Sequence, residues 1–159
     1  MNTADGSNST PVVTEIYLSA VFVPFTVLAT GISVFNGSVV ATDKVRVILY
    51  NDKGNVVASS AAAGFQPTTA DVYENVAFAL GSDGTTAVTT VVLPSGTYYL
   101  GTIYNGTTNR FNAHTVGCFP GGKVTGAVFG TAGVSALLTG VTMPTAFTAA
   151  SLPPIVSLY

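Results

Sequence analysis

The sequence predicts an all-β protein, an antiparallel β-sandwich or jelly roll, and three observations lead to this class. Short segments rich in Val, Ile, Thr and Tyr recur along the 159-residue chain, spaced roughly 8–12 residues apart. The segments between them are rich in Gly, Pro and Asn, the residues of tight turns. No window carries the apolar stripe of period 3.6 that marks a long helix. Many short strands joined by turns are typical of sandwiches and jelly rolls.

We expect one domain preceded by a flexible arm. Residues 1–11 are polar and turn-prone, and residues 12–159 form the expected sandwich domain. The arm has no basic residue, which is unlike a secretory signal. Residues 16–42, 87–109 and 124–159 are uncharged, but Pro and Gly interrupt each stretch, so we expect no membrane span.

The first half of the chain predicts six strands and two hairpins. The strands are expected at residues 12–18, 21–29, 32–35, 39–41, 44–50 and 55–60. Pro24 places a break or a sheet edge in the second of them. Asn36-Gly37 predicts a tight hairpin between its flanking strands, and the turn at residues 51–54 predicts another. Alternation places Lys44 and Arg46 on one face of their strand.

The second half predicts shorter strands. They are expected at residues 72–80, 86–93, 97–104, 110–115, 124–131 and 155–159. Alternate side chains from Tyr98 to Tyr104 share one face of the third of these. Residues 81–84 and Asn105-Gly106 are expected turns. Residues 134–141 are compatible with either a strand or a short helical turn.

Composition narrows the classes of partner. Charged residues are 8% of the chain, against roughly 25% in an average domain. Hydrophobic residues are 48%, and the mean hydropathy is +0.53. With five Lys and Arg and a net charge of −2, we expect no nucleic-acid partner. Scarce charge is a mark of protein interfaces, so we expect a permanent assembly, a homo-oligomer and by default a trimer.

The single His and single Cys offer little chemistry. They cannot form an internal disulfide or a zinc site built of thiolates and imidazoles. His114 and Cys118 lie close enough in sequence to be a thiol–imidazole pair, but no nucleophile motif surrounds Cys118. We interpret Cys118 as a small packed residue and His114 as a hydrogen-bonded one.

The acidic residues point to structure rather than to catalysis. Asp43, Asp52 and Asp83 lie in or beside turns, where Asp binds backbone groups. The spacing of Asp71 and Glu74 would put them on opposite sides of a strand, which does not make a catalytic pair for glycoside hydrolysis. No calcium-loop pattern occurs.

One glycine-rich segment resembles part of a phosphate-binding loop. Gly117, Gly122 and Lys123 have the required spacing, but Val124 stands where Ser or Thr would hold magnesium. Pro120 also removes a backbone N–H from the loop. We interpret the segment as an ordinary turn, and we expect no enzyme, no cofactor and no metal site.

Two further features bear on glycans. Tyr98, Tyr99 and Tyr104 are candidate platforms for sugar rings, although they equally suit a core or a protein interface. Three N-x-S/T sequences, which we interpret as turns rather than glycan sites, begin at Asn8, Asn36 and Asn105.

Several segments together resemble a known kind of domain. They read KVRVILYNDKGNVVASS, LPSGTYYLGTIYNGTTNRF, AVFGT, MPTAFTA and PPIVSLY. Over residues 43–159 the chain resembles a β-sandwich domain found in structural proteins of tailed bacteriophages.

The resemblance implies a non-enzymatic component of the virion and supplies no catalytic residues. For a chain this short we expect a capsid decoration, or cement, protein that binds the major capsid protein or other virion proteins. Residues 1–11 and 124–159 are the expected contact surfaces. A tail or fibre adaptor and a glycan-binding, receptor-recognition module are the alternatives.

Overall fold

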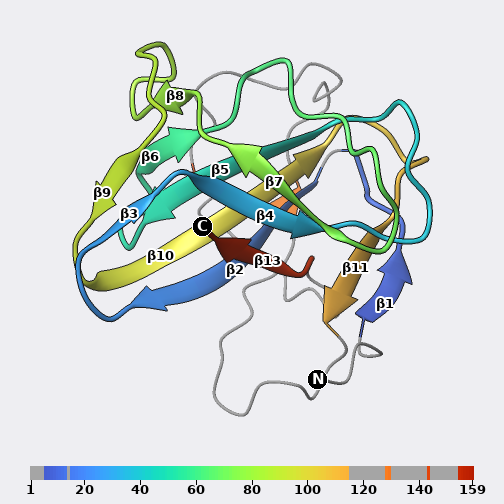
Figure 1. Cartoon of the computed structure of the whole chain (residues 1–159), viewed down its shortest axis with the longest axis horizontal. Coiled ribbons are helices and arrows are strands. Elements are labelled where there is room, and N and C mark those ends of the chain that lie inside the picture. Colours follow the sequence, from blue (N-terminus) through green and yellow to red (C-terminus); the bar gives the residue numbers. More distant parts are fainter. Residues whose placement is uncertain (1–5, 14, 115–127, 130–142, 144–153) are drawn as a thin grey trace.

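The structure is a computed structural model, and it describes residues 6–13, 15–114, 128–129, 143 and 154–159. Its regular elements are all strands, and the described residues contain no helix (Figure 1). The strands are β1 (Gly6–Ser9), β2 (Glu15–Val23), β3 (Val27–Ala29), β4 (Gly31–Phe35), β5 (Val45–Asn51), β6 (Val56–Ser59), β7 (Tyr73–Ala77), β8 (Leu80–Gly81), β9 (Val91–Leu93), β10 (Gly96–Tyr104), β11 (Phe111–His114), β12 (Val128–Phe129) and β13 (Val156–Leu158). The predicted all-β class is confirmed.

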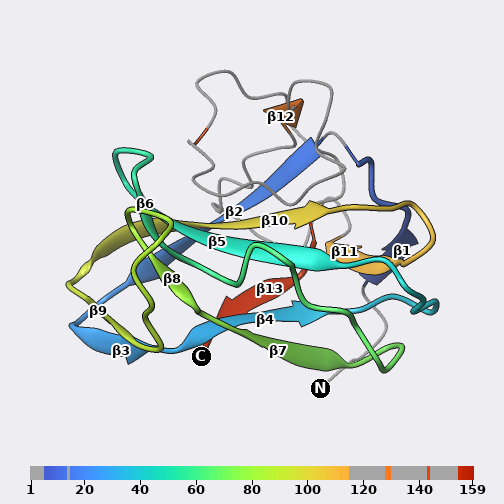
Figure 2. The same cartoon turned by 90° about the horizontal axis from the view of Figure 1, so that it is seen from above.

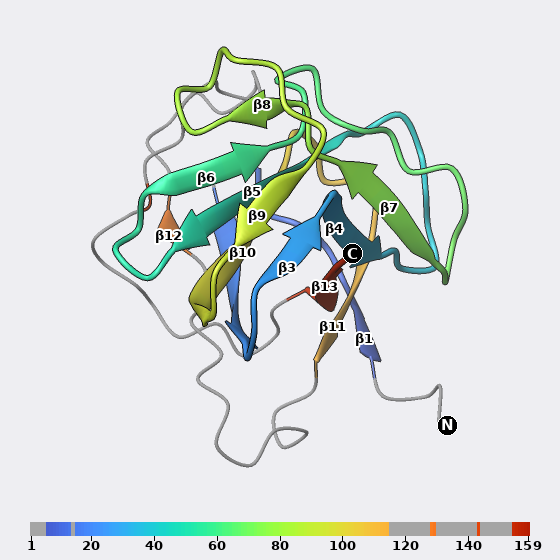
Figure 3. The ribbon, with the colours of Figure 1, turned by 60° about the vertical axis from the view of Figure 1, so that its left-hand side comes forward.

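The strands form two packed layers (Figure 2). One layer is a six-stranded sheet in the order β12-β2-β10-β5-β6-β8. The other contains the sheet β13-β4-β7 and the pair β1-β11, which single bridges between Asn36 and Phe111 and between Ala113 and Pro154 connect to it. Every pairing is antiparallel, and the pair β3-β9 lies at one end of the sandwich (Figure 3).

The core lies between the layers. Alternate residues of β5 and β10 point into it, including Val47, Leu49 and Leu100, and all three are buried. Ile32 and Val34 of β4 approach from the other layer. Burying one such side chain contributes about 1.5–3 kcal/mol, so this face stabilises the fold. The face expected to be shared by residues 98–104 is confirmed as a core face.

The outer face of the six-stranded sheet is also buried. A second cluster there consists of Ile16, Leu18, Ile48, Tyr50 and Ile103, with Met143 packed against it. This explains why β5 is apolar at nearly every position: a strand covered on both sides has no solvent face to mark with polar residues.

The prediction of a hairpin at Asn36-Gly37 is wrong. A tight two-residue hairpin needs positive φ angles, and Gly37 does not have one. The backbone N–H of Asn36 donates to Val72 and that of Gly37 to Arg110, both distant in sequence. The neighbours of β4 are instead β13 and β7.

The hairpin at residues 51–54 is confirmed. Gly54 has φ +78°, and its N–H donates to the carbonyl of Asn51 at 3.0 Å. The flanking strands β5 and β6 pair as expected. This turn closes through local hydrogen bonds, which a sequence pattern can report.

Several other strands have bounds that differ from the expected ones. The first two expected strands merge into β2, which ends before Pro24, and β3 follows it. The strand expected at residues 72–80 divides into β7 and β8. The N–H of Phe78 donates to Thr30 beside β4, whereas that of Ala79 donates to Ser59 of β6 in the other layer. Residues 6–9 of the expected arm form β1. The ambiguous segment 134–141 lies outside the described residues.

Candidate interaction surface

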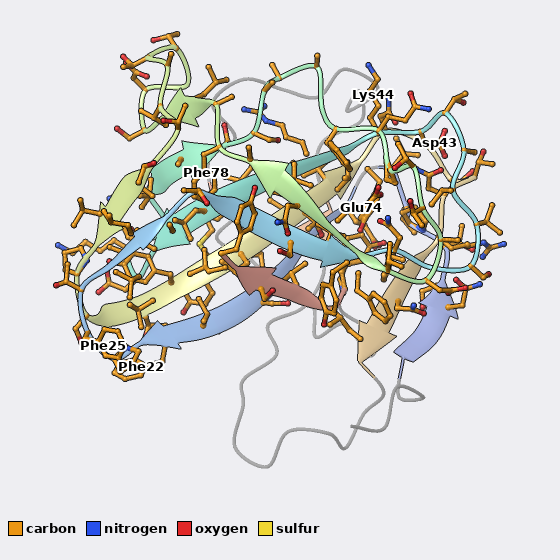
Figure 4. The ribbon with its side chains drawn as sticks, in the orientation of Figure 1. Phe22, Phe25, Asp43, Lys44, Glu74 and Phe78 are labelled. Atoms are coloured by element: carbon orange, nitrogen blue, oxygen red, sulfur yellow. The ribbon has the colours of Figure 1, made fainter. Side chains whose placement is uncertain are left out.

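Four large apolar side chains are exposed at one end of the sandwich. Phe22 is 67% exposed, Phe25 68%, Leu28 67% and Val92 62%. Figure 4 shows Phe22 and Phe25 together where β2 turns toward β3. Leu28 and Val92 are direct cross-strand partners in the β3-β9 pair. We refer to these four residues as the apolar tip.

Strand alternation explains how the apolar tip is presented. In β2, β3 and β9 the residues on either side of the exposed one pack in or against the core; they are Val21, Val23, Val27, Ala29, Val91 and Leu93. Phe22, Leu28 and Val92 therefore point to the opposite side. An outward position on a sheet is usually polar, so three apolar ones beside Phe25 mark an association surface.

The residues of the apolar tip also belong to long stretches of sequence that contain no charged residue. No charged residue occurs between Glu15 and Asp43 or between Asp83 and Arg110. Uncharged side chains lose little solvation on contact with another protein. The four residues of the apolar tip are thus suited to a contact made by apolar burial.

The other end of the sandwich is polar and internally bonded. The Asp43 carboxylate accepts the backbone N–H of Thr108 at 2.6 Å and that of Asn109 at 3.1 Å. Asn109, itself buried, donates through Nδ2 to the Asp43 carbonyl and accepts the N–H of Ala41. Asn105 accepts the N–H of Lys44. We refer to Asp43, Asn105 and Asn109 as the polar clasp, because they hold two loops together.

Glu74 has a similar structural role. Its carboxylate accepts hydrogen bonds from the Thr68 N–H at 2.9 Å, the Thr68 hydroxyl and Asn36 Nδ2 at 2.6 Å. Burial acts to raise the pKa of Glu74, but the hydrogen bonds from Thr68 and Asn36 outweigh it and lower the pKa below its usual value. The ionised carboxylate is thereby committed to holding a loop against β4 and β7.

Asp83 binds its own turn. It accepts the backbone N–H groups of Thr85 and Thr86 and the hydroxyl of Thr86, and these bonds lower its pKa. Asp71 lies outside any strand, so the expected opposition of Asp71 and Glu74 across a strand does not arise. Within the part of the chain that the structure describes, no three His, Cys, Asp or Glu residues gather as metal ligands would.

The candidate sugar platforms are not available as exposed rings. Tyr98 and Tyr104 are buried in the main core, and the Tyr98 hydroxyl donates to the carbonyl of Pro94 at 3.0 Å. Tyr99 is half-buried against the second cluster. Their interpretation as sugar-stacking residues is therefore corrected for Tyr98 and Tyr104, since a buried ring cannot stack on a ligand.

The other sequence candidates divide into two groups. The asparagines of the three N-x-S/T sequences form hydrogen bonds within the chain. Asn8 bonds with Ser38, Asn36 with Thr69 and Glu74, and Asn105 with Lys44. His114 ends β11. The remaining candidates, Cys118, Gly117, Gly122 and Lys123, lie outside the described residues.

Sequence reasoning missed the apolar tip. Pro24 marked a break in the chain, but no local pattern states which side of a strand a second sheet will cover. The available signal was the pair of phenylalanines on either side of Val23-Pro24, in a stretch without charge.

Two further findings bear on the function of this chain. In the described part of the chain no helix has the length and hydropathy to cross a membrane. No family model, no curated protein and no solved structure matches this chain. Among the described residues, the apolar tip is the feature that bears most directly on function.

Proposed function

We propose that this chain is a non-enzymatic structural protein of a tailed-bacteriophage virion, of the capsid-decoration type. In this role the apolar tip seats on the major capsid protein, and the β-sandwich acts as a rigid clamp over a junction between capsid subunits. The observation that carries the proposal is the exposure of Phe22, Phe25, Leu28 and Val92, each above 60%.

The energetics support a contact at this end. Burying one large apolar side chain contributes about 1.5–3 kcal/mol, so four of them can form the centre of an interface. A stable interface buries about 800 Å² on each partner, which the tip and its flanking loops would share. Repetition of the contact over a shell would make small individual gains large for the particle.

The polar residues support a structural role rather than a catalytic one. Asp43, Glu74 and Asp83 each accept at least one hydrogen bond from a backbone N–H of the same chain. A carboxylate held in place by such bonds has fewer free lone pairs with which to take a proton from a substrate. The resemblance to phage structural domains adds the virion as the setting.

The test is cosedimentation with capsids that lack the protein, followed by cryo-electron microscopy of the pellet. We expect wild-type protein to pellet and to give density at capsomer junctions. The double variant Phe22→Ser/Phe25→Ser should lose at least tenfold in affinity, because about 2 kcal/mol or more of apolar burial is removed. Val39→Ser, at an exposed apolar residue away from the tip, is the matched control and should bind normally.

Other results would redirect the proposal. Density on tails instead of capsids would make the protein a tail or fibre adaptor. Equal binding by wild type and the double variant would remove the apolar tip from the interface. Binding to neither structure would overturn the virion role.

A further inference from the structure

β7 is an edge strand of its sheet. The sheet order is β13-β4-β7, and β4 is the only strand that pairs with β7 among the described residues. Figure 2 shows β7 as the outermost strand of its layer. Within the part of the chain that the structure describes, one side of the β7 backbone is therefore left without a strand neighbour.

The register identifies which backbone groups lie on that side. Asn36 donates to the Val72 carbonyl and Phe78 donates to the Thr30 carbonyl, at 3.0 and 2.9 Å. Antiparallel pairs alternate between bonded and non-bonded, so Glu74 and Val76 continue this series toward β4. The N–H and C=O groups of Tyr73, Asn75 and Ala77 then point away from β4.

These three residues also present their side chains to the outside. Tyr73 is 53% exposed and stacks on Phe35 with 4.7 Å between ring centroids. Asn75 and Ala77 are exposed as well. Their neighbour Glu74 is the only charged residue of β7, and its carboxylate is occupied by Thr68 and Asn36.

The edge lacks three features that commonly prevent strand pairing, and its one charged group, Glu74, is bonded to Thr68 and Asn36. Lys, Pro and β-bulges are the common protections of an edge strand. The sequence of β7 is YENVA, and its pairing with β4 runs through five residues without a register shift. An edge with none of these protections and three outward backbone pairs is a template for another strand.

We propose that β7 pairs with β7 of a second copy of this chain, antiparallel and about a two-fold axis through Asn75. In that register Asn75 faces Asn75 of the other copy, and Tyr73 faces Ala77. All three outward-facing residues then form hydrogen-bonded pairs, each of which exchanges two backbone bonds.

Side-chain chemistry fits the same register. A large ring opposite a small methyl group packs without a clash, and this happens twice because the axis relates the two pairs. Asn75 accepts the Ser33 hydroxyl through Oδ1. Its Nδ2 group, which has no partner among the described residues, faces the equivalent amide across the axis. No like charges meet at the centre.

The inference is separate from capsid binding. The apolar tip has no residue on β7, so both surfaces can be used together. A strand pairing with itself produces a closed two-fold dimer, whereas the trimer expected from the sequence would need two different surfaces in each contact.

The first experiment is analytical ultracentrifugation of the full chain. We expect a dimer for the wild type and a monomer for Asn75→Lys, which sets two ammonium groups opposite each other at the axis. Its dissociation constant should rise at least tenfold. Ser82→Lys adds the same charge at an exposed turn and should remain dimeric. Circular dichroism of both variants checks that the fold is intact.

The second experiment reports the register directly. In a Cys118→Ser background, Asn75→Cys should give a covalent dimer with a short bismaleimide, while Val39→Cys should not. A monomeric or trimeric wild type, or dimers lost equally in both lysine variants, would overturn the proposal. Crosslinking equal to that of Val39→Cys would do the same. Capsid binding enters neither measurement, so failure of the virion role leaves this result independent.

Discussion

The two ends of the sandwich use their side chains in opposite ways. At the polar clasp, Asp43, Asn105 and Asn109 form hydrogen bonds within the chain, and Asn109 is buried. At the apolar tip, Phe22 and Phe25 are about two-thirds exposed. Figure 4 shows Asp43 and Lys44 at one end and the two phenylalanines at the other.

The difference separates groups that hold the fold from groups that remain available. A polar atom already bonded inside the chain has to break that bond before it can bind a partner, which cancels much of the gain. An exposed apolar ring gains by leaving water and loses nothing that it had. Conspicuous polar clusters in this protein are therefore structural, and the plain apolar end is the functional candidate.

Removing the polar clasp should give the largest loss of stability among the polar substitutions. Asn109→Ala leaves the N–H of Ala41 and the carbonyl of Asp43 without their partner. Two unsatisfied groups on half-buried residues predict a loss of about 2 kcal/mol in the free energy of unfolding. Urea denaturation followed by circular dichroism measures it.

Asn55→Ala is the matched control for that variant. Asn55 is an exposed turn residue whose backbone, not its side chain, makes the hydrogen bonds of the turn. Its replacement should change stability by less than about 0.5 kcal/mol. Equal effects at Asn109 and Asn55 would contradict a structural role for the clasp.

Glu74 should give an intermediate effect that depends on pH. Glu74→Gln keeps the shape but removes the charge that strengthens the bonds from Thr68 and Asn36, for an expected loss of about 1 kcal/mol at pH 7. The pKa of Glu74 is lower in the folded state than in the unfolded state. Its stabilisation is therefore full above the unfolded value near 4.5 and is lost as pH falls through the folded value.

Denaturation midpoints of the two proteins between pH 7 and pH 3 test this linkage. The gap between wild type and Glu74→Gln should be constant at the upper end and narrow below pH 4.5. A gap that stays constant to pH 3 would mean that the charge of Glu74 contributes nothing to folding.

The contrast between the ends also explains what the sequence could predict. Strand-rich character, the 51–54 hairpin and the core face of β10 follow from local alternation and turn chemistry. Asn36-Gly37 has the same local signature as a hairpin, but its N–H groups bond to Val72 and Arg110. Long-range partners therefore overrode the local preference.

Arg46 shows the same boundary between local and long-range information. By alternation, Arg46 shares one face of its strand with Lys44. Arg46 is buried on the side of the strand that carries the second apolar cluster. Among the described residues only its Nη2 has a hydrogen-bond partner, the Ser59 hydroxyl at 2.9 Å. Which face is covered depends on chain segments far away in sequence, and no strand pattern contains that information.

The smallest change in stability is expected at the apolar tip. Phe25→Ser removes a ring that is 68% exposed, so the free energy of unfolding should change by less than about 0.5 kcal/mol. Phe78→Ser makes the same substitution at a ring that is 2% exposed in the core and should cost more than about 3 kcal/mol. Thermal and urea denaturation of both variants measure the difference.

A small loss of stability for Phe25→Ser would show that this ring is not needed for folding. If Phe25 is dispensable for folding, its exposure cannot be explained by packing within the chain, and water contact with the ring is a cost that only an intermolecular contact removes. A loss near 3 kcal/mol for Phe25→Ser would instead place the ring in the core of the monomer. The two ends of the sandwich would then both be structural, and the apolar tip would no longer support a binding role.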